Sequence, residues 1–151
     1  MLRVVLDTNI FVRGLVNIRS YSGRILTACE DRRIIPLLRK SVLTEYRTIL
    51  SHTEIVSRYP ELEPKKVRVA IERLCYVGDV FPIVTARFKF PRDPRDEKII
   101  ESAIAAEATH IISTDRDLLH LPHGRDDASK RFRQRMPKLE VLQPEEFLRA
   151  I

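Results

Sequence analysis

Four acidic residues lie far apart in the sequence, at positions from which they could share one metal site. Asp7 ends the apolar run Val4-Val5-Leu6, and Asp115 follows a second apolar run that includes Ile111 and Ile112. In an open parallel sheet, ligands bind beyond the carboxyl ends of the strands, so acids that follow two strands can meet at one edge. With the helical acids Glu45 and Asp96, these residues predict a metal-dependent nuclease site.

Phosphodiester hydrolysis explains why several carboxylates would converge. Mg²⁺ and Mn²⁺ prefer hard oxygen ligands, and Mg²⁺ is usually held by a few carboxylates while it keeps waters and substrate phosphate. One or two bound ions make water nucleophilic near neutral pH and stabilise the leaving oxygen. This chemistry needs no cysteine, serine or histidine, and none of the four histidines has a motif partner. The expected cofactor is therefore Mg²⁺ or Mn²⁺.

The helical phase of Asp96 indicates that its side chain points inward. At about 100° per residue, Ile99, Ile100 and Ala103 lie within one arc, and Asp96 projects near the middle of it. A carboxylate on a core face must be hydrogen-bonded, paired or bound to a metal, because leaving it bare is costly. We therefore expect Asp96 to be a metal ligand.

Two neighbouring assignments are less distinctive. Asp93 is predicted to cap the helix, with Pro94 at its first position, so that Asp96 also lies near the positive end of the helix dipole. Glu45 lies about 60° from Val42, at the margin of the apolar stripe of its helix. An acid in that position is commonly solvated. The assignment of Glu45 as a metal ligand therefore rests on the presence of the other three acids and not on its helical phase.

Strands and helices alternate along the chain. We expect strands at 3–6, 34–38, 80–84, 110–113 and 139–142, and helices at 21–31, 41–51, 53–59, 64–76, 94–108 and from Pro144 onward. This order predicts an α/β fold whose sheet is mainly parallel, with helices on both faces. Residues 3–6 are predicted to form the central strand, and Pro36 favours an edge or an irregular ladder for the second strand.

Composition is compatible with one basic domain. The chain has 151 residues, 44% of them hydrophobic, which suffices for one domain that buries roughly 70% of its unfolded surface. We expect residues 1–151 to form that single domain. Lys and Arg outnumber Asp and Glu by 27 to 21, which favours a polyanionic partner.

Cysteine use and hydropathy indicate a reducing, aqueous compartment. Cys29 and Cys75 lie in apolar helical segments without metal-binding spacing, so buried thiols are favoured over a disulfide or a zinc site. The first apolar run is too short for a signal peptide, and no stretch approaches the roughly 20 apolar residues of a membrane span. A cytoplasmic protein without a membrane segment is expected.

Four motifs in order resemble those of PIN-domain ribonucleases. The motifs are Leu6-Asp7-Thr8-Asn9-Ile10-Phe11-Val12, Ser41-Val42-Leu43-Thr44-Glu45-Tyr46, Asp93-Pro94-Arg95-Asp96-Glu97-Lys98-Ile99-Ile100-Glu101-Ser102-Ala103 and Ile111-Ile112-Ser113-Thr114-Asp115-Arg116-Asp117-Leu118-Leu119. The resemblance spans nearly the whole chain, including the closing Pro144-Glu145-Glu146-Phe147-Leu148. It is closest to the VapC-like branch, the toxin components of toxin-antitoxin pairs.

The resemblance implies a three-layer α/β/α sandwich that cuts RNA with Mg²⁺ or Mn²⁺, leaving 5′-phosphate and 3′-hydroxyl ends if two metals act. The implied metal-binding acids are Asp7, Glu45, Asp96 and Asp115. The implied supporting residues are Asn9, Asp93, Thr114 and Asp117, of which Thr114 would orient a ligand or water and Asp117 is peripheral. Equally, Asn9 could cap a turn after the first strand, and Thr114 could cap a helix at 115–119. An antitoxin protein and a second copy of the chain are the implied protein partners.

Residues 120–138 depart from the compact members of that family. This basic insertion contains Lys130, Arg131, Phe132, Arg133 and Arg135, whose cations could hold phosphates while the ring stacks on a base. Arg92 and Arg95 crowd the same edge near Asp96 and are also predicted to contact RNA. A solvated segment that only aids solubility, or one that docks an acidic partner, would have the same composition.

Two other functional classes compete with a nuclease. The strand that ends at Asp7 also resembles the nucleophile strand of haloacid-dehalogenase-like phosphatases, but those enzymes need a second acid where this chain has Asn9. A catalytically silent RNA- or protein-binding module on the nuclease fold is the second alternative. The presence of all four acids argues against the silent module.

Overall fold

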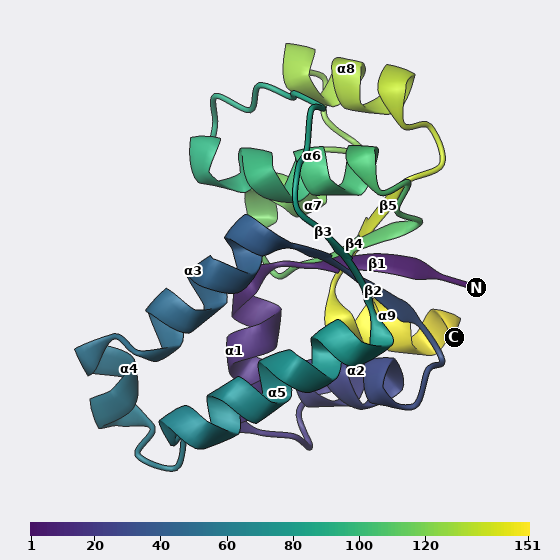
Figure 1. Ribbon diagram of the computed structural model, residues 1–151. Helices are drawn as coiled ribbons and strands as arrows, with labels where there is room; N and C mark the ends of the chain where they lie inside the picture. Colours follow the sequence, from purple (N-terminus) through teal and green to yellow (C-terminus); the bar gives the residue numbers. More distant parts are fainter.

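A sheet of five parallel strands forms the centre of the computed structural model, which describes residues 1–151 (Figure 1). The strands are β1 (Arg3–Leu6), β2 (Ile35–Arg39), β3 (Asp79–Phe81), β4 (His110–Ile112) and β5 (Glu140–Leu142). Their spatial order is β3-β2-β1-β4-β5, so residues 3–6 form the central strand as predicted. The third strand is shorter than the expected range of 80–84.

The second strand lies inside the sheet, so the expected edge position for Pro36 is wrong. β2 pairs with β1 at Ile35 and Pro36, whereas its ladder with β3 begins only at Leu37. The Pro36 carbonyl oxygen faces Gly78, the residue before β3. The missing N–H of Pro36 therefore falls just before the β3 ladder, where no bond between strands is lost. The other expectation, an irregular ladder, takes the form of a ladder with β3 that begins only after Pro36.

Helices cover both faces of the sheet in a three-layer α/β/α arrangement, as predicted (Figure 1). The helices are α1 (Thr8–Val16), α2 (Tyr21–Glu30), α3 (Lys40–Leu50), α4 (Thr53–Arg58), α5 (Pro64–Val77), α6 (Glu97–Ala105), α7 (Arg116–His120), α8 (Asp127–Arg135) and α9 (Pro144–Ala150). A cluster of 20 buried residues joins α1, α2, α3, α5 and α9 to one face. A second cluster of 14 joins α6, α7 and α8 to the other face.

Helix α1 follows β1 directly and was not predicted from the sequence. Its β-branched residues and Gly14 give it a weak intrinsic helix propensity. Tertiary packing compensates, because Ile10 and Phe11 are fully buried in the first cluster. Gly14 permits close contact with α2, since a Cβ there would lie 2.6 Å from Leu26 Cδ1. The helix thus depends on packing against α2.

The predicted helix at 94–108 is divided and ends early. A 3-10 turn (Pro94–Asp96) precedes α6, which stops at Ala105. Glu107 has a positive φ of 53° and ends the helical path. Asp93 caps the turn as expected, because its Oδ1 accepts a hydrogen bond of 3.2 Å from the Arg95 backbone N–H.

None of the helices combines the length and apolarity that crossing a bilayer requires.

Cys29 is buried and Cys75 is half-buried, and both thiols are free. Burial raises the pKa of the Cys29 thiol to about 12, which keeps it protonated and unreactive.

Candidate metal centre

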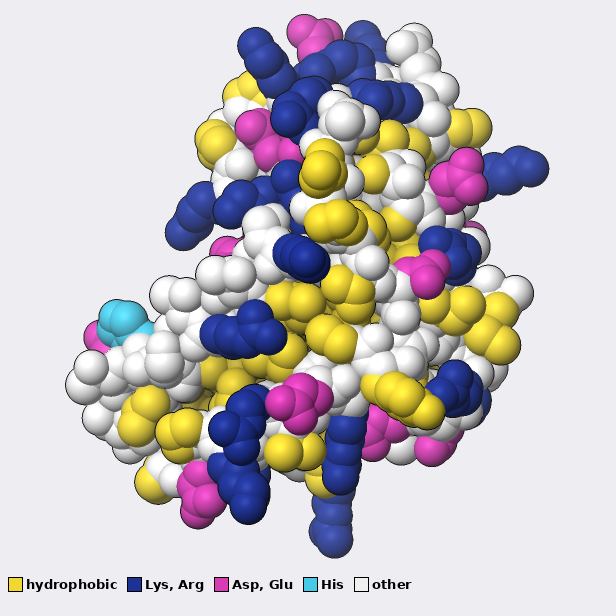
Figure 2. Space-filling model, viewed as in Figure 1, with side chains coloured by type: hydrophobic (Ala, Val, Ile, Leu, Met, Phe, Trp, Pro, Cys, Tyr) yellow, Lys and Arg dark blue, Asp and Glu magenta, His cyan; other side chains and the backbone are white.

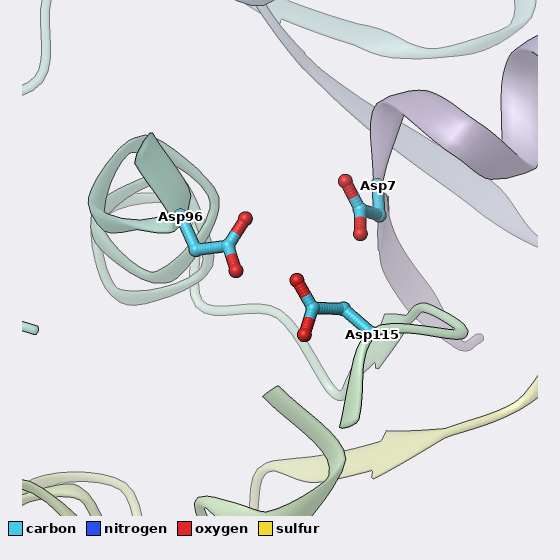
Figure 3. A group of neighbouring side chains, drawn as sticks. All are labelled: Asp7, Asp96 and Asp115. Carbon is cyan, nitrogen blue, oxygen red and sulfur yellow. The ribbon is translucent and has the colours of Figure 1, made fainter. Parts of the chain in front are cut away.

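Three carboxylates from three separate elements meet at the carboxyl edge of the sheet. Asp7 follows β1, Asp115 lies after β4, and Asp96 is the last residue of the 3-10 turn, directly before α6. One oxygen atom from each residue lies within 4.8 Å of those of the other two. Figure 3 shows the three carboxylates pointing toward one another. The structure therefore brings together three of the four predicted acids.

The pairing of β1 with β4 places two of these acids side by side. Leu6 is the register partner of Ile112, so Asp7 and Ser113, the next residue of each strand end, lie side by side. The Asp7 backbone N–H donates to the Ile112 carbonyl at 3.0 Å, which extends the ladder by one more bond. Asp7 is only 7% exposed.

Ser113 connects the two strand ends and was not singled out from the sequence. Its hydroxyl donates a hydrogen bond to Asp7 Oδ2 at 2.7 Å. The Ser113 Oγ atom also accepts a hydrogen bond from the Asp115 backbone N–H at 2.9 Å. Ser113 is fully buried, so water does not compete for these bonds. The sequence does contain a signal for this residue. Ser113 is polar but directly continues the apolar run Ile111-Ile112, and it lies two residues before Asp115.

Asp115 has two structural tasks. Its Oδ1 accepts a hydrogen bond of 2.8 Å from the Asp117 backbone N–H and caps α7, and one of its carboxylate oxygens also belongs to the trio. The helix cap considered for Thr114 is therefore supplied by Asp115 instead. Thr114 is half-buried beside Asp115, where its role as an orienting residue stays a prediction.

Asp96 is a buried carboxyl group, and one of its two oxygen atoms lacks a hydrogen-bond partner. It is 8% exposed, and its Oδ2 atom is buried with no hydrogen-bond partner. Burial, a hydrogen bond with Asp115 and the charge of Asp7 together raise the pKa of Asp96 to about 8. Burial also raises the pKa of Asp7, although the Ser113 hydrogen bond opposes that effect. The three carboxyl groups thus lack a neighbouring cation that would favour their ionised forms.

These donors fit a divalent cation. A hard cation prefers oxygen ligands, and Mg²⁺ in particular is held by a few carboxylates. A cation would supply the missing partner of Asp96 Oδ2 and remove the repulsion among three acids. The residues that could hold it are Asp7, Asp96 and Asp115.

Glu45 lies near this trio but outside it. It is half-buried on α3, and its negative charge contributes to the raised pKa of Asp7. The next residue, Tyr46, is fully buried, and its hydroxyl donates to the Leu6 carbonyl at 2.9 Å. Helix α3 is thereby fixed against the end of β1. Metal binding by Glu45 remains a prediction.

The supporting residues occupy the rim. Asn9 is exposed on the first turn of α1, so it does not cap a turn after β1. Asp117 Oδ1 lies 3.5 Å from Arg92 Nε, and Asp93 Oδ1 lies 3.3 Å from Arg95 Nε. Both arginines are exposed at this edge, each beside one acid.

The basic segment folds as α8 and packs on the second cluster. Phe132 is 1% exposed and contacts Phe88 edge to face at 6.3 Å, so the predicted stacking on an RNA base is wrong. Arg131, Arg133 and Arg135 each donate to backbone carbonyls outside the helix, and Lys130 is exposed. Spacing could have shown this, because Ala128 and Phe132 lie four residues apart on one face.

Comparison with known proteins identifies relatives of the chain. A family model described as PIN domain matches residues 3–117, which include the acidic trio and end before α8. An uncharacterized protein of Methanocaldococcus jannaschii, MJ1680, is 28% identical over 149 residues, covering 97% of this chain and 90% of that protein. No solved structure gives a significant match.

Proposed function

The chain belongs to the PIN domain family, and on this premise we propose that it is a metal-dependent endoribonuclease that hydrolyses RNA phosphodiester bonds. The observation that carries the proposal is the unpartnered, buried Asp96 Oδ2 within the carboxylate trio. Leaving such a group bare is costly, and a cation would remove that cost. The resemblance to ribonucleases supports RNA as the substrate.

The chain's own residues would hold and orient the reacting groups. Asp7, Asp96 and Asp115 would bind Mg²⁺ or Mn²⁺, and Glu45 would contribute from α3. When bound, the cation would activate water and neutralise charge that develops on the phosphate. Ser113 donates a hydrogen bond to Asp7 Oδ2 and would thereby hold this carboxylate in one orientation for the cation. Asp96 would release its proton on binding, because only its ionised form is a good ligand.

Positive side chains at the rim would guide RNA to the acids. Arg92 and Arg95 are exposed beside the centre, and each has hydrogen-bond donors beyond its one nearby carboxylate. Phosphates could exchange with these exposed ion pairs, which contribute little on their own. Asn9, Thr114 and Asp117 would complete the rim around the scissile phosphate.

A role as the toxin of a toxin-antitoxin pair is a further part of the proposal. It rests on the motifs that resemble the VapC-like branch, and it implies an antitoxin protein, a cytoplasmic location and an RNA target. A homodimer is usual for the resembling proteins. The PIN domain match disfavours the phosphatase alternative.

RNA cleavage with and without chelator tests this function. A labelled single-stranded RNA and the DNA of the same sequence would be incubated with the protein and Mg²⁺ or Mn²⁺, then with EDTA. We expect cleavage of the RNA only, its loss in EDTA, and 5′-phosphate ends on the products. Binding of RNA without cleavage in either metal would show a silent module instead.

A further inference from the structure

A basic notch lies between α8 and the extended segment 87–90, outside the carboxylate trio. The notch is an open surface depression of about 320 Å³, lined by Arg87, Phe88, Arg131, Gln134 and Arg135. None of these five residues is acidic, and three are cations. Figure 2 shows Lys and Arg side chains gathered over α8, at the top of that face.

The notch arginines are held in place by the fold. Arg131 Nη2 donates to the Lys89 carbonyl at 3.0 Å, and its guanidinium lies 5.2 Å from the centre of the Phe88 ring. Arg135 donates to the Arg87 carbonyl, and Arg87 donates to the Val84 carbonyl at 2.8 Å. A guanidinium has five N–H donors, so each keeps several that point elsewhere. Cations fixed in this way lose little freedom when they bind an anion.

The segment 87–90 alternates basic and aromatic residues. Phe88 and Phe90 are buried, whereas Arg87 and Lys89 are exposed. The backbone N–H groups of both phenylalanines donate to carboxylates of α6. The segment is therefore fixed between α6 and α8 with its cations outward.

The same hydrogen bonds define a path from the notch to the carboxylate trio. Phe90 binds Glu97, the residue after Asp96, whereas Phe88 binds Glu101, one turn further along α6. Glu97 and Glu101 are thus separated by about 6 Å along the axis of α6, at about 1.5 Å per residue. The notch residue Phe88 lies at Glu101, and Lys89 and Arg92 are exposed on the stretch between Phe88 and Asp96.

From this arrangement we propose that the notch binds a backbone phosphate of the RNA, away from the phosphate that is cleaved. The identity of the anion as RNA rests on the proposed function. Clustered arginines in a notch whose lining contains no acid favour phosphate groups, and bidentate guanidinium contacts match the geometry of those groups. The notch would thereby favour RNA long enough to reach both sites over short fragments.

Binding measured without cleavage tests the notch independently of the nuclease activity. The full chain in EDTA would be titrated against a fluorescent single-stranded RNA of about 20 nucleotides, longer than a typical single-strand footprint. Gln134→Glu adds a negative charge to the notch and leaves every arginine hydrogen bond intact. Lys66→Gln makes the same net charge change on an exposed position of α5. We expect a Kd about fivefold higher for Gln134→Glu, and little change for Lys66→Gln.

A second variant removes the cations themselves. In Arg131→Gln/Arg135→Gln, the slope of log Kd against log salt should shrink by about 0.7 for each phosphate that the protein no longer neutralises. Circular dichroism would verify that α8 remains folded, and Gln134→Glu is informative even if this variant does not fold.

RNA binding at the notch and metal-dependent RNA cleavage can fail independently of each other. Equal Kd values for wild type, Gln134→Glu and Lys66→Gln, or no RNA binding by any of them, would overturn the notch. Tighter binding of a phosphoserine peptide than of RNA, sensitive to Gln134→Glu, would also overturn it. Metal-dependent cleavage by the wild type would still stand in each case, because it is measured separately.

Discussion

Ser113 donates a hydrogen bond of 2.7 Å to the carboxylate of Asp7, so the end of β4 fixes the acid at the end of β1. The same hydroxyl accepts a hydrogen bond from the Asp115 backbone N–H. One buried oxygen atom is therefore hydrogen-bonded both to the Asp7 side chain and to the Asp115 backbone. Removing a partner that orients a metal ligand typically lowers metal affinity by about 10- to 100-fold. The arrangement of Asp7 and Asp115 therefore depends on Ser113, a residue outside the trio.

Replacing Ser113 tests that dependence. Ser113→Ala should weaken Mn²⁺ binding, measured by isothermal titration calorimetry, about 10- to 100-fold, because Asp7 loses its orienting bond. Ser113→Thr retains a hydroxyl and should keep more of the affinity than the alanine variant. Wild-type affinity in folded Ser113→Ala would show that the hydrogen bond does not position Asp7.

The stability of the metal-free protein should depend on pH through Asp96. Its pKa is about 4 in an unfolded chain and about 8 when folded. The folded state therefore holds a proton between these values that the unfolded state has lost, so the free energy of unfolding falls as the pH rises from 4 to 8. Thermal unfolding in EDTA should give a lower Tm at pH 8 than at pH 6.

Asp96→Asn provides the matching comparison. An amide cannot ionise, so at pH 8 in EDTA this variant should have a Tm several degrees above wild type, at about 2–4 °C per kcal/mol for a domain of this size. Adding Mn²⁺ should raise the Tm of wild type and leave the variant unchanged. An equal pH dependence in both proteins would remove Asp96 as its source.

Glu45 should matter less than the three aspartates. Glu45 lies outside the trio, so Glu45→Gln should lower the cleavage rate about tenfold, within the range seen for residues around a metal ligand. Asp7→Asn should reduce the rate further, because it removes a ligand. Single-turnover cleavage at saturating Mn²⁺ would rank the two, and a larger loss for Glu45→Gln would place Glu45 among the direct ligands.

Phe132 should act on stability rather than on RNA affinity. It is buried against Phe88, so Phe132→Ala should lower the free energy of unfolding by about 3–5 kcal/mol. Urea unfolding would measure that decrease. A variant with wild-type stability and much weaker RNA binding would restore the stacking hypothesis.

The acids could be predicted from sequence because simple periodicities position them. Asp7 and Asp115 end apolar strands, and the inward phase of Asp96 follows from 3.6 residues per turn. Parallel strands then bring their ends to one edge. Glu45, at the margin of its helix, was also the acid that the structure leaves outside the trio.

The missed features depend on packing between distant segments. Helix α1 follows from packing against α2, which weak propensity does not reveal. Ser113 gains its importance only when β1 and β4 pair, 106 residues apart in sequence. Pro36 was given an edge position because a single strand does not show where the neighbouring ladder begins.

The central claim is that Asp7, Asp96 and Asp115 bind the metal on which RNA hydrolysis depends. The most direct measurement is the single-turnover cleavage rate of one labelled RNA at saturating Mn²⁺, for wild type, Asp96→Asn and the exposed control Asp31→Asn. We expect Asp31→Asn to match wild type, and Asp96→Asn to be slower by about 100-fold or more, since even indirect supports cost about 10- to 100-fold. Equal metal-dependent rates for all three proteins would contradict the claim.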